Sequence, residues 1–219
     1  ELTFAVNHLS HYFLTTKIIP LLRKAKRPRI IITSSEVHNP ESGGGRIGQP
    51  ADLGDLTGLK SRNNFSMIDG KSPFSADKAY KDSKVCNILF ARELYRRFRT
   101  QISNLTVIAW APGLVIPRTN EGFFRYSRKY NEFGQKMFAF FARDIFRISE
   151  TVEDAGQILR DLVIEECFAK NNFTYYSNNI IGLSKHKLME SSISVEAAND
   201  DLARDLWCYS DKLITSIKS

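Results

Sequence analysis

A tyrosine and a lysine four positions apart, Tyr80 and Lys84, are the residues of this chain best suited to chemistry. They fall in a segment with helical periodicity, and positions i and i+4 of a helix lie on one face. An ammonium favours the ionised form of a nearby phenol, so the spacing predicts a lowered pKa for Tyr80 and proton transfer near neutral pH. The pattern alone is weak, because about one chance occurrence is expected in a lysine-rich chain with 8 tyrosines.

The segments around this pair alternate between helix and strand. Apolar periodicity predicts helices over 5–22, 76–98, 152–166 and 195–217, and β-rich runs predict strands over 29–35, 105–110 and 173–177. This alternation indicates an α/β fold, a Rossmann-like parallel sheet with helices on both faces. The 219 residues fit a single domain over 1–219, in which 36–77 is rich in Gly, Pro, Asn and Ser and is predicted to be a long loop.

Three further places in the chain are predicted to lie near the tyrosine and the lysine. Ser35 ends the first predicted strand, Pro112-Gly113 follows the second, and Asn7 lies on the helix before them. Open α/β sheets bind ligands outside the carboxyl ends of their strands. Each residue alone has an ordinary structural explanation, Asn7 as a cap or surface residue and Ser35 as the start of a loop. Their order along the chain favours a common site.

Taken in that order, these residues resemble the proton-relay site of the short-chain dehydrogenase/reductase family. The resemblance implies that Ser35 positions the substrate and Tyr80 supplies a proton. It also implies that Lys84 holds the nicotinamide ribose and lowers the Tyr80 pKa, while Asn7 anchors a water chain. Pro112-Gly113 would lie against the nicotinamide, so Asn7, Tyr80, Lys84, Pro112 and Gly113 are the expected cofactor-binding residues.

A finer resemblance links the chain to the protochlorophyllide reductases within that family. The stretches that carry it are Lys78–Asn87, Asn7–His11, Asp52–Leu59 and Met67–Gly70, with the long insertion over 36–77. The resemblance implies light-driven, NADPH-dependent reduction of the C17=C18 double bond of protochlorophyllide to chlorophyllide, in chlorophyll biosynthesis. It further implies a plastid location in the stroma or at the thylakoid, or the cytoplasm of a cyanobacterium. Peripheral membrane association and a homo-oligomer are also expected.

Cys86 is the rival proton donor in this reading. On an ideal helix it points ~120° away from Tyr80, so only a broad pigment or an irregular helix start would let both reach one substrate. A buried cysteine of the core is the alternative explanation. The chain has three cysteines without C-x-x-C spacing, so no metal site is expected.

An aromatic and basic segment over 118–148, densest between Phe123 and Phe146, is expected to form a lid. Aromatic faces suit a flat tetrapyrrole, and basic groups suit its carboxylate or an anionic lipid surface. Packing on the core with snorkelling Arg and Lys is equally consistent. The formal net charge is +7, but the basic residues follow no recognisable RNA- or DNA-binding motif, so nucleic-acid binding is not favoured.

The glycine-rich run Gly43–Gly48 satisfies G-x-G-x-x-G, but no strand precedes it and no helix follows it. We interpret it as a loop, and expect the true dinucleotide fingerprint in an N-terminal part of the fold that this sequence lacks. After Pro112-Gly113, Leu114 and Pro117 depart from the family pattern, which weakens the expected grip on the cofactor there.

Two other functions fit the same residues. One is a dark, NAD(P)-dependent retinol- or steroid-type carbonyl reductase, which the run Asn87–Leu94 also suits. The other is a pigment-binding or membrane-attached scaffold without turnover. The substrate is therefore inferred from the resemblance alone, whereas the enzyme class is also supported by the Tyr80/Lys84 pattern.

Overall fold

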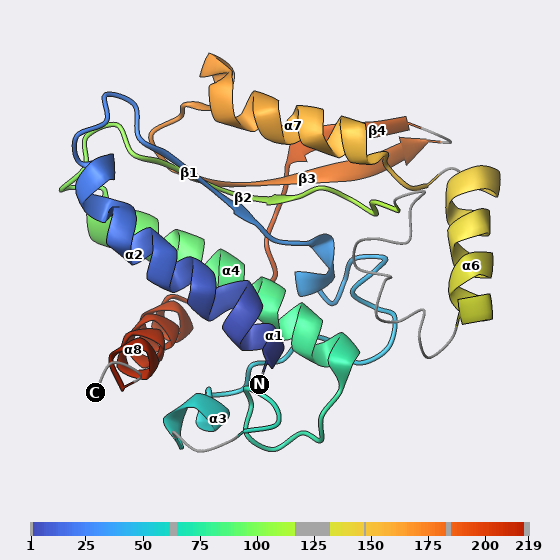
Figure 1. Cartoon of the computed structure of the whole chain (residues 1–219), viewed down its shortest axis with the longest axis horizontal. Helices are drawn as coiled ribbons and strands as arrows, with labels where there is room; N and C mark the ends of the chain where they lie inside the picture. The colour runs from blue at the N-terminus through green and yellow to red at the C-terminus, as the bar shows by residue number, and fades with distance from the viewer. Residues whose placement is uncertain (1, 62–64, 117–131, 147, 183–184, 217–219) are drawn as a thin grey trace.

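The computed structural model describes residues 2–61, 65–116, 132–146, 148–182 and 185–216 (Figure 1). Its elements in chain order are α1 (Leu2–Phe4), the π-helical turn η1 (Ala5–Leu9), α2 (Ser10–Leu22), β1 (Arg29–Thr33), the 3-10 turn η2 (Glu36–His38), α3 (Thr57–Lys60), α4 (Ala76–Phe98), β2 (Thr106–Ala111), α6 (Glu132–Phe140), the π-helical turn η3 (Phe141–Ile145), α7 (Val152–Ile164), the 3-10 turn η4 (Glu166–Phe168), β3 (Phe173–Gly182), β4 (Lys185–Glu190) and α8 (Asp200–Ser216).

The described strands form one four-stranded sheet in the order β1-β2-β3-β4. The first three strands are parallel, with Ile32 opposite Ala109 and Trp110 opposite Tyr176. β4 runs antiparallel to β3 at the edge. The predicted α/β, Rossmann-like fold is confirmed, although the antiparallel edge strand was not predicted.

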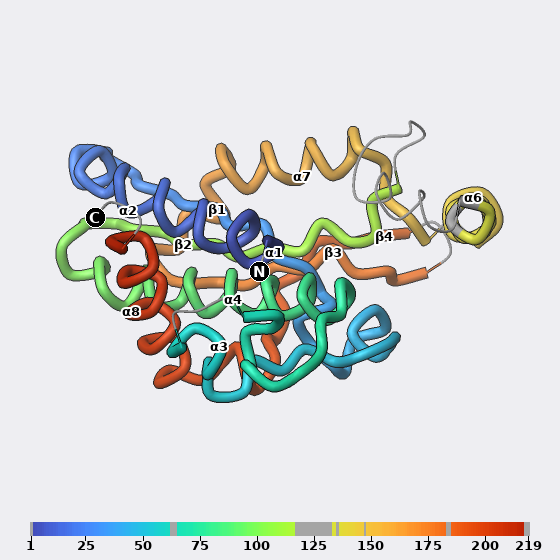
Figure 2. The backbone as a smooth tube through the Cα atoms, turned by 60° about the horizontal axis from the view of Figure 1, so that its bottom comes forward, coloured from blue at the N-terminus to red at the C-terminus, as the bar shows by residue number. Residues whose placement is uncertain are grey.

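Helices cover both faces of this sheet. α7 lies on one face, where Leu162 packs with Ile108, Trp110 and Tyr176. α4 and α8 lie on the other face together with the insertion, as Figure 2 shows. α2 joins that larger core through Tyr12, whose ring contacts the rings of Phe90 and Trp207. The helix that carries the candidate residues is therefore enclosed between the sheet and an outer layer.

The predicted bounds of α4 are confirmed, and local chemistry explains them. The Ser75 hydroxyl accepts a hydrogen bond from the Lys78 N–H at 3.3 Å, which caps the first turn. Asp77 lies in that first turn, while Arg96 and Arg97 lie in the last one, each favourable to the helix dipole. These ends fix the phase of the helix, and therefore which face Tyr80 and Lys84 occupy.

The insertion over 36–77 is mostly irregular, as predicted; in its described part, η2 and α3 are the only regular turns before α4 begins at Ala76. Of the expected lid over 118–148, the structure describes α6 and η3, whereas 117–131 and 147 lie outside the described residues. Within the part of the chain that the structure describes, no helix is both long and apolar enough to cross a bilayer.

Candidate functional site

Tyr80 and Lys84 lie on one face of α4, at the carboxyl end of β1. The Lys84 ammonium is over the Tyr80 ring, 5.3 Å from its centroid. It also donates to the Thr33 carbonyl oxygen at 3.4 Å, although only 8% of the residue is exposed. The phenol and the ammonium therefore lie close together, as predicted. They are at the carboxyl ends of the strands, where ligands of this fold bind.

The pKa of Tyr80 shifts in the direction opposite to the prediction. Burial raises the pKa of Tyr80, and a hydrogen bond with Ser35 acts in the lowering direction without reversing the shift. Burial also lowers the pKa of Lys84 to about 8. Because a partly buried phenol resists ionisation, Tyr80 is protonated at neutral pH. A protonated phenol can donate a proton to a bound substrate, whereas accepting one requires the ionised form.

Asn7 reaches the same region from the π-helical turn η1. Its side-chain Nδ2 donates to the Ser83 hydroxyl at 3.0 Å, and Ser83 in turn donates to the Tyr80 carbonyl oxygen at 2.6 Å. The His11 ring hydrogen-bonds the Asn7 carbonyl and lies close enough to Lys84 to be affected by its charge. π-helical turns often occur at functional sites. Asn7 thus braces α4, and His11 is a neighbour that sequence reasoning missed.

Two buried polar groups fix Lys84 from behind. The Ser34 hydroxyl donates to the Lys84 carbonyl oxygen at 2.9 Å. Asn87 Nδ2 donates to the Thr33 carbonyl oxygen at 3.1 Å, so Asn87 and Lys84 converge on one atom. Asn87 was not singled out, although its position follows the i, i+4, i+7 spacing from Tyr80 that marks one helix face.

Pro112 and Gly113 follow β2 at the same sheet edge. Gly113 has φ +86°, a conformation that favours glycine. A side chain there would approach the Asn178 carbonyl oxygen to 3.2 Å. Asn178 Nδ2 also donates to the Pro112 carbonyl oxygen at 3.3 Å. The loop is therefore held close to β3, and Asn178 is a second residue that sequence reasoning missed.

Cys86 lies in the main hydrophobic core and is 0% exposed. Its surroundings match the alternative explanation, a small apolar residue of the core. The thiol is enclosed in the core, and its role as a proton donor stays a prediction.

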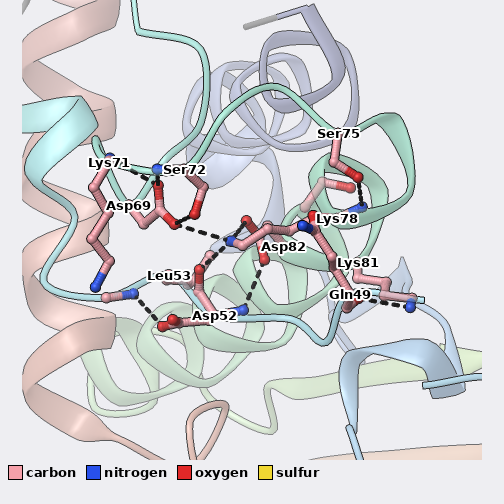
Figure 3. A network of polar contacts seen from close by, with 12 residues as sticks. Gln49, Asp52, Leu53, Asp69, Lys71, Ser72, Ser75, Lys78, Lys81 and Asp82 are labelled. Carbon is pink, nitrogen blue, oxygen red and sulfur yellow. Dashed lines mark hydrogen bonds and ion pairs between the residues drawn. The ribbon is translucent and has the colours of Figure 1, made fainter. Parts of the chain in front are cut away.

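The opposite side of the α4 start is fastened to the insertion by a buried ion cluster (Figure 3). Lys78 Nζ donates to Asp82 Oδ2 at 2.6 Å and to the Asp52 carbonyl oxygen at 2.5 Å, and it lies 3.4 Å from Asp69 Oδ2. Asp82 accepts the Asp52 N–H at 2.9 Å. Burial raises the pKa of Asp82 to about 6, against the opposing effect of Lys78. These charges lock the insertion to the helix that carries Tyr80.

Lys81 forms a second fastening and is only 1% exposed. Its ammonium donates to the carbonyl oxygens of Ile47 and Gln49, the latter at 2.8 Å, and lies 2.9 Å from Asp77 Oδ2. The glycine-rich run thus turns carbonyl oxygens toward a cation. A phosphate cradle needs N–H groups instead, which supports interpreting Gly43–Gly48 as a loop.

No family model matches the chain. Over 98% of its length, however, it is 32% identical to protochlorophyllide reductase A of Oryza sativa subsp. japonica and 33% identical to protochlorophyllide reductase B of Hordeum vulgare, both chloroplastic. The chain is a homologue of the protochlorophyllide reductases, oxidoreductases of the short-chain dehydrogenase/reductase superfamily. It spans about half the length of these relatives, 54% and 52% respectively.

A solved structure supports the fold alone. A crystal structure of an uncharacterized protein from Mycobacterium paratuberculosis superposes with a TM-score of 0.53 at 21% identity. The match covers 96% of this chain and 57% of that one. The Rossmann-like arrangement of the homologue is therefore found in a distant solved protein as well.

The residues of this site fit a nicotinamide nucleotide. The Lys84 ammonium has three protons, and its hydrogen bond to Thr33 uses one of them, so ribose hydroxyls could accept the others. Gly113, at φ +86°, presents no side chain to a ligand that approaches the loop after β2. Among the described residues, no group of three His, Cys, Asp or Glu side chains is placed to hold a metal ion.

Proposed function

We propose that this chain forms the C-terminal part of a light-driven, NADPH-dependent protochlorophyllide reductase, which reduces the C17=C18 double bond to give chlorophyllide. The observation that carries the proposal is the Tyr80–Lys84 face on α4, hydrogen-bonded to Ser35, in a chain whose relatives are named protochlorophyllide reductases. On this proposal the protein acts in chlorophyll biosynthesis. Its relatives are named chloroplastic, which supports a plastid location.

Tyr80 is the proposed proton donor. Burial raises its pKa, so the phenol keeps its proton until a carbanion-like centre forms on the pigment beside it. Ser35 orients the phenol through their hydrogen bond, and the Asn7–Ser83 contact braces the backbone beneath it. A conjugated macrocycle is hard to reduce from its ground state. Light therefore supplies the driving force, while the protein supplies position.

Lys84, Asn7 and the Pro112–Gly113 loop are the proposed contacts to the nucleotide, which supplies the hydride when bound. Lys84 has donors to spare for the ribose, and Gly113 allows close approach of the backbone. The proposed acidic pigment also suits a basic protein, whose formal net charge is +7. The aromatic and basic segment over 118–148 is the proposed cover of the pigment.

The test uses the full-length protein with NADPH and protochlorophyllide, held in darkness and given single flashes. A flash-induced shift in pigment absorbance is expected in the wild type, and Tyr80→Phe should lose it by about 100-fold while still binding pigment. Tyr95→Phe is the matched control on the same helix, because its hydroxyl donates to the Asn171 carbonyl oxygen at 2.9 Å and it lies eleven positions beyond Lys84.

Each alternative has its own signature in the same assay. Steady NADPH oxidation by an aldehyde in darkness, without any flash response, would assign the chain to the dark carbonyl reductases. Tight pigment binding without reduction, unaffected by Tyr80→Phe, would identify a scaffold. Either result refutes the proposed reaction.

A further inference from the structure

Glu150 links two stretches of chain that the proposed reaction would need in fixed positions. Its N–H donates to the Leu114 carbonyl oxygen at 2.8 Å, and it forms a parallel bridge with Val115. Glu150 therefore holds the strand-like run that follows Gly113.

The side chain of Glu150 holds the same loop by a second route. Its Oε1 accepts a hydrogen bond from Asn178 Nδ2 at 3.0 Å, and that amide also donates to the Pro112 carbonyl oxygen at 3.3 Å. Asn178 is 5% exposed and Glu150 is 9% exposed, so water competes little for these contacts. An amide nitrogen shared between a carboxylate and a carbonyl fixes both, because each proton has a separate acceptor.

His186 of β4 completes the cluster. Its Nδ1 lies 2.8 Å from Glu150 Oε1, and its Nε2 lies 3.2 Å from the Ile148 carbonyl oxygen. In the protonated form of His186 both ring nitrogens donate, and the contact with Glu150 becomes a charge-assisted hydrogen bond. The Ile148 N–H in turn donates to the Ala142 carbonyl oxygen in η3, at 2.8 Å. The cluster thus joins the aromatic segment to the loop after β2.

We propose that Glu150, held by Asn178 and His186, is a positioning residue that sets the Pro112–Gly113 loop for the nicotinamide ring. This rests on the proposed function, because it assigns the loop to the cofactor. At Leu114 and Pro117 the sequence differs from the family pattern, which weakens the expected contacts of this loop with the cofactor. The loop is instead held by Asn178 of β3, His186 of β4 and Glu150, which lies just before α7.

The first test needs no nucleotide, light or pigment. Amide hydrogen exchange is compared in the full-length protein for the wild type, Glu150→Gln and His186→Gln, with Glu153→Gln as the control. Glu153 lies three residues on and is exposed. Peptides covering 112–116 should exchange about tenfold faster in the first two variants, and peptides of α4 should not change. Unchanged exchange at 112–116 would overturn the proposal.

The second test measures NADPH affinity in darkness by nucleotide fluorescence. Glu150→Gln and His186→Gln should each weaken binding by about tenfold, and Glu153→Gln should not. Faster exchange with unchanged NADPH affinity would also overturn the proposal. If Glu150→Gln does not fold, His186→Gln decides, because β4 is an edge strand with largely exposed residues. Neither readout involves turnover, so failure of flash reduction would count against the proposed function alone.

Discussion

The Lys84 ammonium lies over the Tyr80 ring, 5.3 Å from the ring centroid, while three residues earlier Lys81 points into the insertion. On an ideal helix Lys84 is ~40° and Lys81 ~100° from Tyr80. The two lysines are both buried, yet they have different tasks. That difference makes them a matched pair for mutation.

Replacing Lys84 by alanine should reduce flash-driven turnover by about 100-fold with little loss of stability. Burial lowers the Lys84 pKa to about 8, so the fold gains little from its charge. Lys81→Ala should instead lower the free energy of unfolding by about 3 kcal/mol, because it leaves buried carbonyl oxygens unpaired. Single-flash yield and urea unfolding of the same preparations check both. Equal losses of turnover would contradict this assignment.

Cys86→Ala separates the two candidate proton donors. Because Cys86 is 0% exposed within the core, its removal should cost about 1 kcal/mol of stability and leave turnover near the wild-type value. Tyr80→Phe should give the reverse pattern. Flash yield per bound pigment is the measurement, and a large loss in Cys86→Ala with normal pigment binding would transfer the role of donor to the thiol.

The contribution of Glu196 to stability should fall as pH rises from about 4.5 to about 7. It opposes the contributions of the buried His8 and His38, whose pKa values burial lowers to about 3 and about 4. Burial raises the pKa of the Glu196 carboxyl to about 7 from an ordinary value of 4.5, so the folded protein binds this proton more tightly than the unfolded chain does. The gain is complete below the unfolded pKa and is lost as pH passes the folded one. For this group the change is about 3 kcal/mol. Asp82, raised to about 6 by burial, contributes in the same direction.

Glu196→Gln should remove this contribution, so that between about pH 4.5 and about pH 7 the variant loses less stability, or gains more, than the wild type. The glutamine oxygen can still accept the Leu53 N–H, which lies 2.6 Å from the carboxylate in the wild type, so the fold is kept. Urea unfolding at about pH 5 and about pH 7.5 measures the slope, with Glu153→Gln as the exposed control. A pH dependence of stability identical to that of the wild type would show that another group binds the proton.

Two glycines of one motif test whether the run over 43–48 binds phosphate. A methyl group at Gly43 meets no atom of the described residues within 4 Å, so Gly43→Ala should change neither stability nor NADPH affinity. Gly48 has φ +72°, and a methyl group there would lie 2.7 Å from Asp77 Oδ2. Gly48→Ala should therefore lower the free energy of unfolding by about 1–2 kcal/mol, again without changing NADPH affinity. Weaker NADPH binding by Gly43→Ala would revive the phosphate-binding interpretation.

Periodicity and capping residues carry enough information to predict the sheet and α4. Ser75 and the apolar rows of 76–98 specify the helix, and β-branched runs specify β1 and β2. β4 escapes prediction because the segment Lys185–Glu190 is polar and largely exposed, with no apolar run. The π-helical turn at Asn7 escapes because its sequence looks like ordinary helix.

The site itself was only half predictable. Residue spacing and the predicted strand ends identify Tyr80, Lys84 and Ser35 as candidates. The direction of the Tyr80 pKa shift was predicted wrongly, because burial raises the pKa. A lysine in a helical pattern suggests a solvated face, so the buried roles of Lys78 and Lys81 were not visible. Their partners lie about 30 residues away in an irregular loop, where sequence separation gives no register.

The lysine fastenings on the back of α4 have a consequence for building new enzymes from this scaffold. The insertion is attached to α4 by buried charged side chains of that helix. Without the insertion, Lys78 would lose the Asp69 carboxylate and the Asp52 carbonyl oxygen, and Lys81 would lose the carbonyl oxygens of Ile47 and Gln49. Grafting this loop onto another short-chain reductase should thus succeed only if Lys78, Lys81 and Asp82 travel with it. Conversely, deleting the loop calls for apolar replacements at those three positions, so that no orphan charge remains beneath the new surface.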